Sequence, residues 1–319
     1  MLGGSSSAYR RYLLWVSYDG SKFTGVAGIE NGNSVVGFIV AALRRIFPNS
    51  SEIVKATQSS RTDSGVHANS NALCVQVPAE GIGSNKEELL TQLNFLATDC
   101  LPGCLNILDV RAVSDGFCVR RHALYREYKY RLLVAQNEIA WEMGRSASLT
   151  SFAEKNYSWI LRSGFDPYKA SFACRFFQDT HNFASFMKYP SKEKMKDLVV
   201  PSTTRKIQYF SIDSGHSKYA GDDGFDCYEV TIVAKSFLRQ QVRRMISVLV
   251  AYSYGYITLE VFKSLLADPC PQKFHNYGFK PAPAGGLFLE KVVYDERSFL
   301  YPVPYMQGLW SGEDLPSNG

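Results

Sequence analysis

The stretch Ser59–Ala68 constrains the fold most, because it is a polar turn enclosed by two strand-like segments. It reads Ser-Ser-Arg-Thr-Asp-Ser-Gly-Val-His-Ala, and Asp63 is its single carboxylate. Residues 52–56 and 71–77 read as strands, the second rich in Val and Leu. Gly65 lets the backbone turn tightly behind Asp63. The sequence therefore predicts two consecutive strands joined by a loop that presents a carboxylate.

Strands and helices are mixed along the rest of the chain. Apolar and alternating runs predict further strands at 11–18, 105–113, 125–134, 203–212, 225–234 and 286–295. Apolar residues at helical spacing predict helices at 35–46, 86–97, 151–162 and 236–252, and another around 262–266. Asn33 or Ser34 is expected to cap the first helix, and Ser84 or Asn85 the second. The pattern is that of an α+β protein.

Composition permits a large acidic partner without requiring one. The 319 residues are 45% hydrophobic, enough for two lobes with real cores. Lys and Arg exceed Asp and Glu by 35 to 30, which gives a net charge of +5. The basic residues concentrate in one segment, where a single acid accompanies Arg120, Arg121, Arg126, Lys129 and Arg131. Tyrosines are interleaved with them at 125, 128 and 130. Cations interleaved with aromatic rings are typical of nucleic-acid binding.

Several other classes of protein are disfavoured. The seven cysteines are scattered without a C-x-x-C pair, which favours free thiols in a reducing compartment over a zinc site. The acids Asp222, Asp223 and Asp226 supply no complete ligand set, so an exposed acidic turn is favoured over a cation site. No apolar run reaches the roughly 20 residues that a membrane helix needs. No membrane partner is therefore expected.

Four segments, in order, carry a resemblance to a known family. Arg61–Ala68 resembles the signature of TruA-type tRNA pseudouridine synthases, in which the aspartate is catalytic. The other three are Tyr18–Gly25, Arg126–Arg131 and Phe237–Met245, with weaker matches at Thr180–Phe186 and Gly286–Leu289. The match extends from about Tyr12 to Tyr294. The residues Ser59-Ser60 and the segment Phe237–Met245 are most similar to the animal pseudouridine synthase-like 1 branch.

The resemblance implies the chemistry of the site. Conversion of uridine to pseudouridine breaks an N-glycosidic bond and rejoins the base through carbon, so neither metal nor cofactor is needed. It requires a carboxylate and a group that removes the C5 proton. Asp63 aligns with that carboxylate, and Arg243 aligns with the arginine that keeps it ionised. Tyr128 aligns with the tyrosine that stacks on the target base and is a candidate for the proton step.

The resemblance also implies the partner. Arg61 aligns with a residue that helps to extrude the nucleotide. Binding of the RNA backbone is expected from Arg120, Arg121, Arg126 and Lys129. The family default is a tRNA uridine, whereas the branch is associated with mitochondria and with messenger RNA. RNA, as tRNA or mRNA, is therefore the expected partner, a homodimer the expected assembly, and the mitochondrial matrix the expected location, with cytoplasm and nucleus as alternatives.

The implied fold is α+β with two lobes, each a mostly antiparallel sheet backed by helices, and a basic active-site cleft between them. The lobes are expected at 9–113 and 114–298, with tails at 1–8 and 299–319. This chain departs from the family in carrying Ser60 and Ser64 where Gly and Ala are usual. Val26-Ala27 replaces Trp-Gln, which leaves the substrate open.

Other interpretations stay open at the level of sequence. Without the family, Asp63 reads as a polar turn, Tyr128 as a packing residue and Arg243 as an exposed side chain of an amphipathic helix. His67 is expected to stabilise the turn. A non-catalytic RNA-binding or ribosome-assembly protein on the same scaffold is the main rival. A glycosidase would need a second carboxylate near Asp63, and none is evident.

Overall fold

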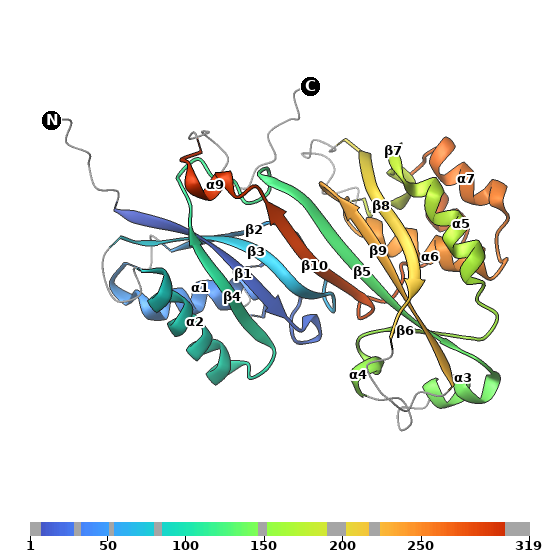
Figure 1. Cartoon of the computed structure of the whole chain (residues 1–319), viewed down its shortest axis with the longest axis horizontal. Coiled ribbons are helices and arrows are strands. Elements are labelled where there is room, and N and C mark those ends of the chain that lie inside the picture. Colours follow the sequence, from blue (N-terminus) through green and yellow to red (C-terminus); the bar gives the residue numbers. More distant parts are fainter. Residues whose placement is uncertain are drawn as a thin grey trace. The chain divides into compact units, whose positions relative to one another are not determined.

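A computed structural model describes residues 8–28, 33–50, 54–79, 85–145, 152–189, 202–216 and 224–303 (Figure 1). Within these ranges the chain combines helices with mostly antiparallel strands, which confirms the predicted α+β class. The chain divides into two compact units. The first unit comprises Met1–Leu124 and Leu289–Gly319, and the second comprises Tyr125–Phe288.

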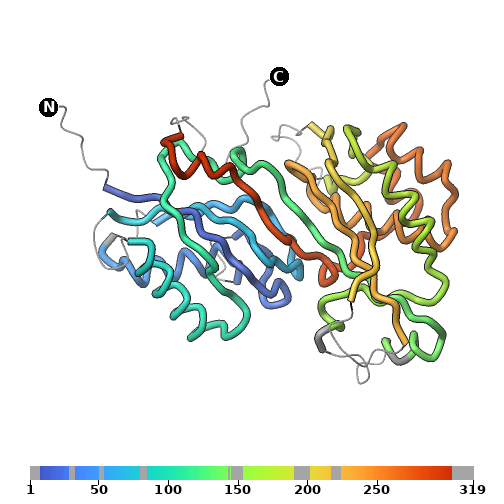
Figure 2. Tube along the Cα trace, in the orientation of Figure 1, coloured from blue at the N-terminus to red at the C-terminus, as the bar shows by residue number. Residues whose placement is uncertain are grey.

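The first unit is built on a sheet whose strand order is β4-β1-β3-β10, with β2 paired to β3. These strands are β1 (Tyr9–Tyr18), β2 (Lys55–Gln58), β3 (His67–Pro78), β4 (Leu105–Ala112) and β10 (Leu287–Tyr294). β1 pairs antiparallel with both β3 and β4, and β2 pairs antiparallel with β3. β10, the last strand among the described residues, thus lies beside β3, as the trace in Figure 2 shows.

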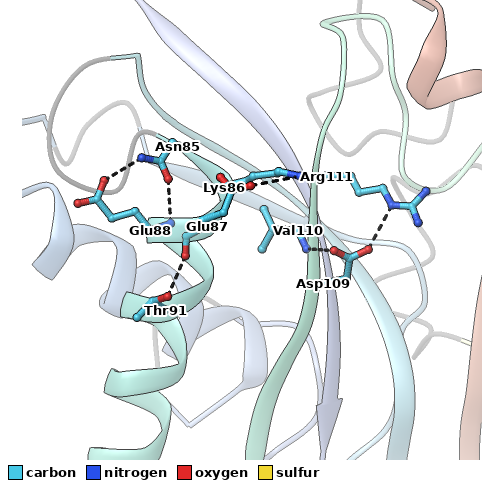
Figure 3. A network of polar contacts seen from close by, with 8 residues as sticks. All are labelled: Asn85, Lys86, Glu87, Glu88, Thr91, Asp109, Val110 and Arg111. Carbon is cyan, nitrogen blue, oxygen red and sulfur yellow. Dashed lines mark hydrogen bonds and ion pairs between the residues drawn. The ribbon is translucent and has the colours of Figure 1, made fainter.

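Helices α1 (Val35–Ile46) and α2 (Lys86–Cys100) pack against each other and against this sheet. Ser34 caps α1, because its Oγ accepts the Gly37 N–H at 2.9 Å. Asn85 caps α2 by accepting the Glu88 N–H at 2.8 Å and donating to the Glu88 carboxylate at 3.2 Å (Figure 3). Both caps confirm a predicted choice. The short elements are η1 (Gly20–Lys22), η2 (Pro48–Ser50) and α9 (Arg297–Leu300).

The second unit is built on a sheet of order β5-β9-β8-β7, with β6 paired to β5. The strands are β5 (Ala123–Ala135), β6 (Trp159–Leu161), β7 (Asp179–Asn182), β8 (Thr204–Ser214) and β9 (Phe225–Ala234). The helices are α3 (Glu138–Arg145), α4 (Phe152–Lys155), α5 (Pro167–Phe177), η3 (Ala184–Phe186), α6 (Gln241–Ser253), α7 (Leu259–Ala267) and α8 (Lys273–Asn276). α5 packs on β8 and on α6, which in turn contacts α7 (Figure 1).

The predicted helix over 151–162 is wrong after Lys155. The helix α4 ends at Lys155, and Trp159–Leu161 forms β6, which pairs parallel with Leu132–Val134 of β5. Apolar residues in a short run suit a buried strand as well as a helix, and the partner strand lies far away in the sequence. This segment forms a strand because its backbone N–H and C=O groups can pair with those of β5.

The predicted helix over 236–252 begins later than expected, at Gln241. Gln240 has a left-handed backbone, with φ of 60°, which a continuing helix does not allow. The Gln241 side chain accepts the Leu238 N–H at 2.8 Å and so holds the turn before the helix. Helices α3 and α5 were not predicted. The predicted strand at 52–56 lies partly outside the described residues, as do Asp222 and Asp223.

The boundaries of the two units differ from the predicted lobes at 9–113 and 114–298. An aromatic cluster explains the difference, because the Phe117 ring lies 5.4 Å from Tyr294 and 6.0 Å from Phe299. The ring centres of Trp15, in β1, and Phe299 lie 5.9 Å apart. Ring contacts of this kind tie residues 114–124 and the end of β10 to the first sheet.

None of the helices described is both long enough and apolar enough to cross a bilayer. All seven cysteines are free thiols. Cys74 is fully buried in β3, and burial raises the pKa of its thiol to about 11.

Candidate active site

Asp63 begins a tight turn between β2 and β3. The Asp63 carbonyl accepts the Val66 N–H at 3.1 Å, which closes the turn. Gly65 has φ of 80°, the value that the third position of a type II turn requires and that other residues rarely adopt. The Asp63 side chain is half-buried. The predicted loop with a carboxylate at its head is therefore present.

One side of the turn is held by Gly25 and Val26. Gly25 and Asp63 form an antiparallel bridge, and the Val26 N–H donates to the Thr62 carbonyl at 3.2 Å. Gly25 has φ of 121°, and a Cβ there would lie 2.9 Å from the Thr62 oxygen. Only glycine permits this approach without strain.

The other side of the turn rests on Gly20. The Gly65 N–H donates to the Gly20 carbonyl at 3.1 Å. A Cβ on Gly20 would lie 2.0 Å from the Val66 oxygen, far inside van der Waals contact. His67, which is 2% exposed, places Nδ1 3.1 Å from the Gly20 nitrogen and 3.1 Å from an Asp19 carboxylate oxygen.

Buried hydroxyls and an amide support the turn from within the unit. The Tyr18 hydroxyl lies 2.8 Å from Thr62 Oγ1. Asn71, which is fully buried, donates through Nδ2 to the Tyr18 hydroxyl at 3.1 Å and to the Ser60 carbonyl at 3.2 Å. Buried polar groups with satisfied hydrogen bonds specify one geometry, so this network restricts the position of Asp63.

Three predicted RNA-binding residues belong to the same unit as Asp63. Arg61 and Arg121 are exposed, and Arg120 is half-buried. The Arg120 Nε donates to the carbonyl of Gln58, three residues before Arg61, at 3.3 Å. Arg120 is therefore next to the chain segment that leads into the turn.

Tyr128 and Arg243 belong to the second unit. Tyr128 is 6% exposed, and its ring packs edge-on against Phe237 at 5.1 Å. Two residues along β5, the Tyr130 hydroxyl donates to the Pro283 carbonyl at 2.8 Å, while Arg243 Nε donates to the adjacent Ala282 carbonyl at 2.7 Å. Tyr128 and Tyr130 share one face of β5 because side chains alternate. Arg243 therefore lies near the face that carries Tyr128.

Burial and charge act in opposite directions on Tyr130. Its hydroxyl is enclosed by the protein, and this raises its pKa well above the ordinary value, while the positive charge of Arg243 opposes the rise. A Cβ on Gly286 would lie 2.7 Å from the Tyr130 ring, so glycine is needed for this packing. Tyr130 is thus a neutral hydrogen-bond donor beside Arg243.

The structure places Arg126 and Lys129 in existing contacts. Arg126 is 6% exposed, and its Nη1 donates to the Lys235 carbonyl. Lys129 Nζ lies 2.7 Å from Glu229 of β9, in a pair about one-third exposed. Any contact of Lys129 with RNA would compete with this ion pair. The predicted alternation of β5 is present from Arg126 to Tyr130, where Arg126, Tyr128 and Tyr130 are buried and the residues between them are half-exposed. Arg131, expected on the more exposed face, is buried as well, in an ion pair with Glu154.

The next residue after Arg243 is a buried cation. Arg244 is 3% exposed, and its Nη1 donates to the Met187 carbonyl at 2.8 Å. Its guanidinium lies 4.5 Å from the centre of the Phe274 ring, and Nη2 lies 3.2 Å from His275 Nε2. Burial lowers the pKa of Arg244 to about 10. Arg244 therefore connects α6 to the segment around Met187 and to α8.

The predicted site residues thus fall into two sets. Those of the first unit are Arg61, Asp63, Arg120 and Arg121, and those of the second are Arg126, Tyr128, Lys129 and Arg243. The sequence places Gly20 in a turn and Gly25 in a loop, but it does not predict their contacts with the Asp63 turn, and it gives no role to Asn71. The two glycines were the available signal, because each can mark a close backbone approach. Over the ranges described, no cluster of His, Cys, Asp and Glu could hold a metal ion.

The chain is similar to known proteins that share one family description. A family model described as tRNA pseudouridine synthase matches residues 173–295. The tRNA pseudouridine synthase-like 1 of Mus musculus is 31% identical over 302 residues, which cover 92% of this chain and 97% of that protein. The Homo sapiens protein of the same name is 31% identical, covering 91% and 92%. The tRNA pseudouridine synthase A of Thermus thermophilus is 27% identical, covering 90% and 98%.

These matches define the class of protein as a pseudouridine synthase, which is an isomerase. More narrowly, the chain belongs to the TruA-type tRNA pseudouridine synthase family, in which the animal tRNA pseudouridine synthase-like 1 proteins are among its relatives. The family membership indicated by the four sequence motifs is confirmed.

Proposed function

We propose that this protein converts uridine to pseudouridine in structured RNA with Asp63 as its catalytic carboxylate. The observation that carries the proposal is the turn at Asp63, where contacts from Gly25 on one side and Gly20 on the other fix the backbone. A carboxylate held in one position can attack the sugar or stabilise its developing positive charge without reorganisation. The names of the relatives favour tRNA as the substrate. We keep mRNA as a second candidate from the resemblance of the sequence.

Tyr128 and Arg243 are proposed as the other catalytic residues. The Tyr128 phenol is the candidate for the transfer of the C5 proton, and its ring can stack on the base. Arg243 carries a permanent positive charge that favours the ionised form of a nearby carboxylate. A double-mutant cycle of Asp63→Asn and Arg243→Ala tests whether they act together: non-additive losses of turnover support the proposal, and additive losses oppose it.

The proposed RNA contacts are cationic. Arg61 is the candidate for extruding the target nucleotide, and the backbone contacts are assigned to Arg120, Arg121, Arg126 and Lys129. Arg61 and Arg121 are exposed and so can reach a phosphate, which makes them the first to test.

We further propose that the protein acts as a homodimer in the mitochondrial matrix. Light scattering during gel filtration and fractionation of cells test the two parts.

The deciding experiment compares Asp63→Asn with wild type on a tRNA pool, followed by mapping of pseudouridine. We expect turnover to fall by roughly 1000-fold or more, because Asn lacks the reacting carboxylate. The Asn side chain has nearly the same shape as that of Asp, so the fold should be unaffected. RNA affinity should be unchanged. Asp99→Asn is the matched control, since Asp99 is an exposed aspartate of the same unit. Identical pseudouridine maps for wild type and Asp63→Asn would contradict the proposal.

The rival, a protein that only binds RNA, makes a different prediction. Under this reading, the protein binds RNA and forms no pseudouridine, so neither wild type nor Asp63→Asn would show turnover. Both proteins would bind RNA equally well. Substitution of Arg120 and Arg121 by Ala should weaken binding and reduce the dependence of affinity on salt by about one phosphate contact each. A loss of affinity without any measurable turnover in wild type would favour the rival.

A further inference from the structure

Both main-chain groups of Gly20 are used by the residues that follow Asp63. The Gly20 carbonyl accepts the Gly65 N–H at 3.1 Å. The Gly20 N–H points at Nδ1 of His67, at 3.1 Å. Gly20 itself is buried against Val66, where no side chain could fit. Gly20, two residues after the end of β1, is therefore attached to the turn that starts at Asp63 through both of its main-chain groups, and His67 supplies one of these two attachments.

His67 Nδ1 has two neighbours that make opposite demands. The Gly20 N–H requires a lone pair on that nitrogen, whereas the Asp19 carboxylate, also 3.1 Å away, would require a hydrogen. One ring nitrogen offers only one of the two. The direction of the Gly20 N–H is set by its peptide plane and cannot adjust. The Asp19 oxygen already accepts the Ser21 N–H at 2.9 Å, and its side chain is 17% exposed.

These contacts favour a neutral imidazole with its hydrogen on Nε2. In that form Nδ1 satisfies the buried Gly20 N–H, which would otherwise lose its hydrogen bond. Asp19 keeps its bond to Ser21 and its access to water. The proximity of Asp19 to His67 is then a close approach that becomes an ion pair only when the ring is protonated.

We propose that His67 is a positioning residue for Asp63, acting as a neutral hydrogen-bond acceptor for the Gly20 N–H. The proposal rests on the proposed catalytic role of Asp63. The path between them is short: Val66 directly precedes His67 and donates its N–H to the Asp63 carbonyl at 3.1 Å. Release of His67 from Gly20 loosens one end of this turn. A displacement of about 1 Å at a reacting group can lower turnover about 100-fold.

Two substitutions of His67 distinguish a role of Nδ1 as a hydrogen-bond acceptor from a role of the side chain in filling volume. Asn places its side-chain oxygen near the position of Nδ1 and can accept the Gly20 N–H, whereas Gln extends toward the position of Nε2. We expect kcat of His67→Gln to fall about 100-fold with KM changed less than about threefold, and kcat of His67→Asn to stay within about fivefold of wild type. Equal losses in the two variants, or wild-type kcat in His67→Gln, would overturn the proposal.

A matched control is available in the same unit. Nδ1 of His122 accepts the Cys118 N–H at 3.0 Å, the same kind of contact at a place outside the Asp63 turn. His122→Gln should lower the unfolding midpoint to a degree similar to His67→Gln and leave kcat unchanged. A similar drop of kcat in both variants would mean that His67 contributes only to stability, and the positioning role would be lost.

A spectroscopic measurement makes the proposal independent of catalysis. The chain has five histidines, so ¹⁵N-histidine labelling gives a simple imidazole spectrum in which His67 is assigned by its absence in His67→Asn. We expect an unprotonated, hydrogen-bonded Nδ1 at neutral pH in wild type and in Asp63→Asn. A protonated Nδ1 would overturn the proposal even if Asp63 proves catalytic. An active Asp63→Asn enzyme would instead contradict the proposed function and leave the His67 geometry intact.

Discussion

Asp63 in the first unit and Arg243 in the second are held by different kinds of contact. The turn at Asp63 is fixed by main-chain groups, with Gly25 on one side and Gly20 on the other. Arg243 stands on a helix, and its guanidinium is fixed by a side-chain contact, because Nε donates to the Ala282 carbonyl at 2.7 Å. The Arg243 carbonyl in turn accepts the Ala282 N–H at 3.1 Å. Its neighbour Arg244 holds the same helix through a carbonyl, an imidazole and a ring.

The difference predicts different tolerance to substitution. A main-chain contact that leaves no room for a Cβ cannot be rescued by a change of rotamer, because the backbone itself must move. A side-chain contact can be replaced by another side chain of similar volume at small cost. The turn at Asp63 should therefore be more sensitive to substitution than the surroundings of Arg243, and the predictions below test that comparison.

The largest effect on stability is expected for Gly20→Ala. The new Cβ would lie 2.0 Å from the Val66 oxygen, so the turn or β1 must shift. We expect the free energy of unfolding to fall by about 3 kcal/mol, with kcat about 100-fold lower. Chemical denaturation and pseudouridine assays measure the two. Gly103→Ala is the control, because Gly103 also lies in this unit, has φ of 71° and has open space around it. It should cost only about 1–2 kcal/mol and leave kcat unchanged.

An intermediate effect is expected from the titration of Cys74, on the strand that follows the turn. Burial raises the pKa of this thiol from 9.0 to about 11. The folded state thus keeps its proton where the unfolded state loses it, so this contribution is complete below pH 9 and is lost as pH rises to 11. Wild type should lose roughly 2–3 kcal/mol over that interval relative to Cys74→Ala. Urea denaturation at pH 8 and pH 11 measures it, with exposed Cys100→Ala as the control; equal slopes for Cys74→Ala and wild type would contradict it.

The smallest effect is expected for Arg244→Met. The substitution loses the bond to the Met187 carbonyl, but it also removes a buried charge whose partners, over the described residues, include no carboxylate. The two effects oppose each other, so the free energy of unfolding at pH 7 should change by no more than about 1 kcal/mol. The measurement is thermal or urea unfolding of both proteins. A loss as large as that of Gly20→Ala would contradict the comparison between the Asp63 turn and the surroundings of Arg243.

Much of the fold could be predicted because its pattern is local. Strand β9 begins and ends at the predicted residues, Phe225 and Ala234, because alternation over ten residues is unambiguous. The helix α1 buries the predicted apolar stripe, including Ile39 and Leu43. The short strand β6 could not be predicted, because a run of three residues becomes a strand only when a distant partner such as β5 is available.

The candidate site shows the same division. The amino-acid sequence by itself determined the carboxylate turn at Asp63, the alternation that buries Tyr128, and the family to which the chain belongs. Only the tertiary structure decided that the Gly20 N–H donates to His67 Nδ1, that Lys129 is paired with Glu229, and that Arg244 is buried. Turns and periodicity depend on neighbouring residues, whereas a close backbone approach or a buried cation depends on groups that only folding brings within reach.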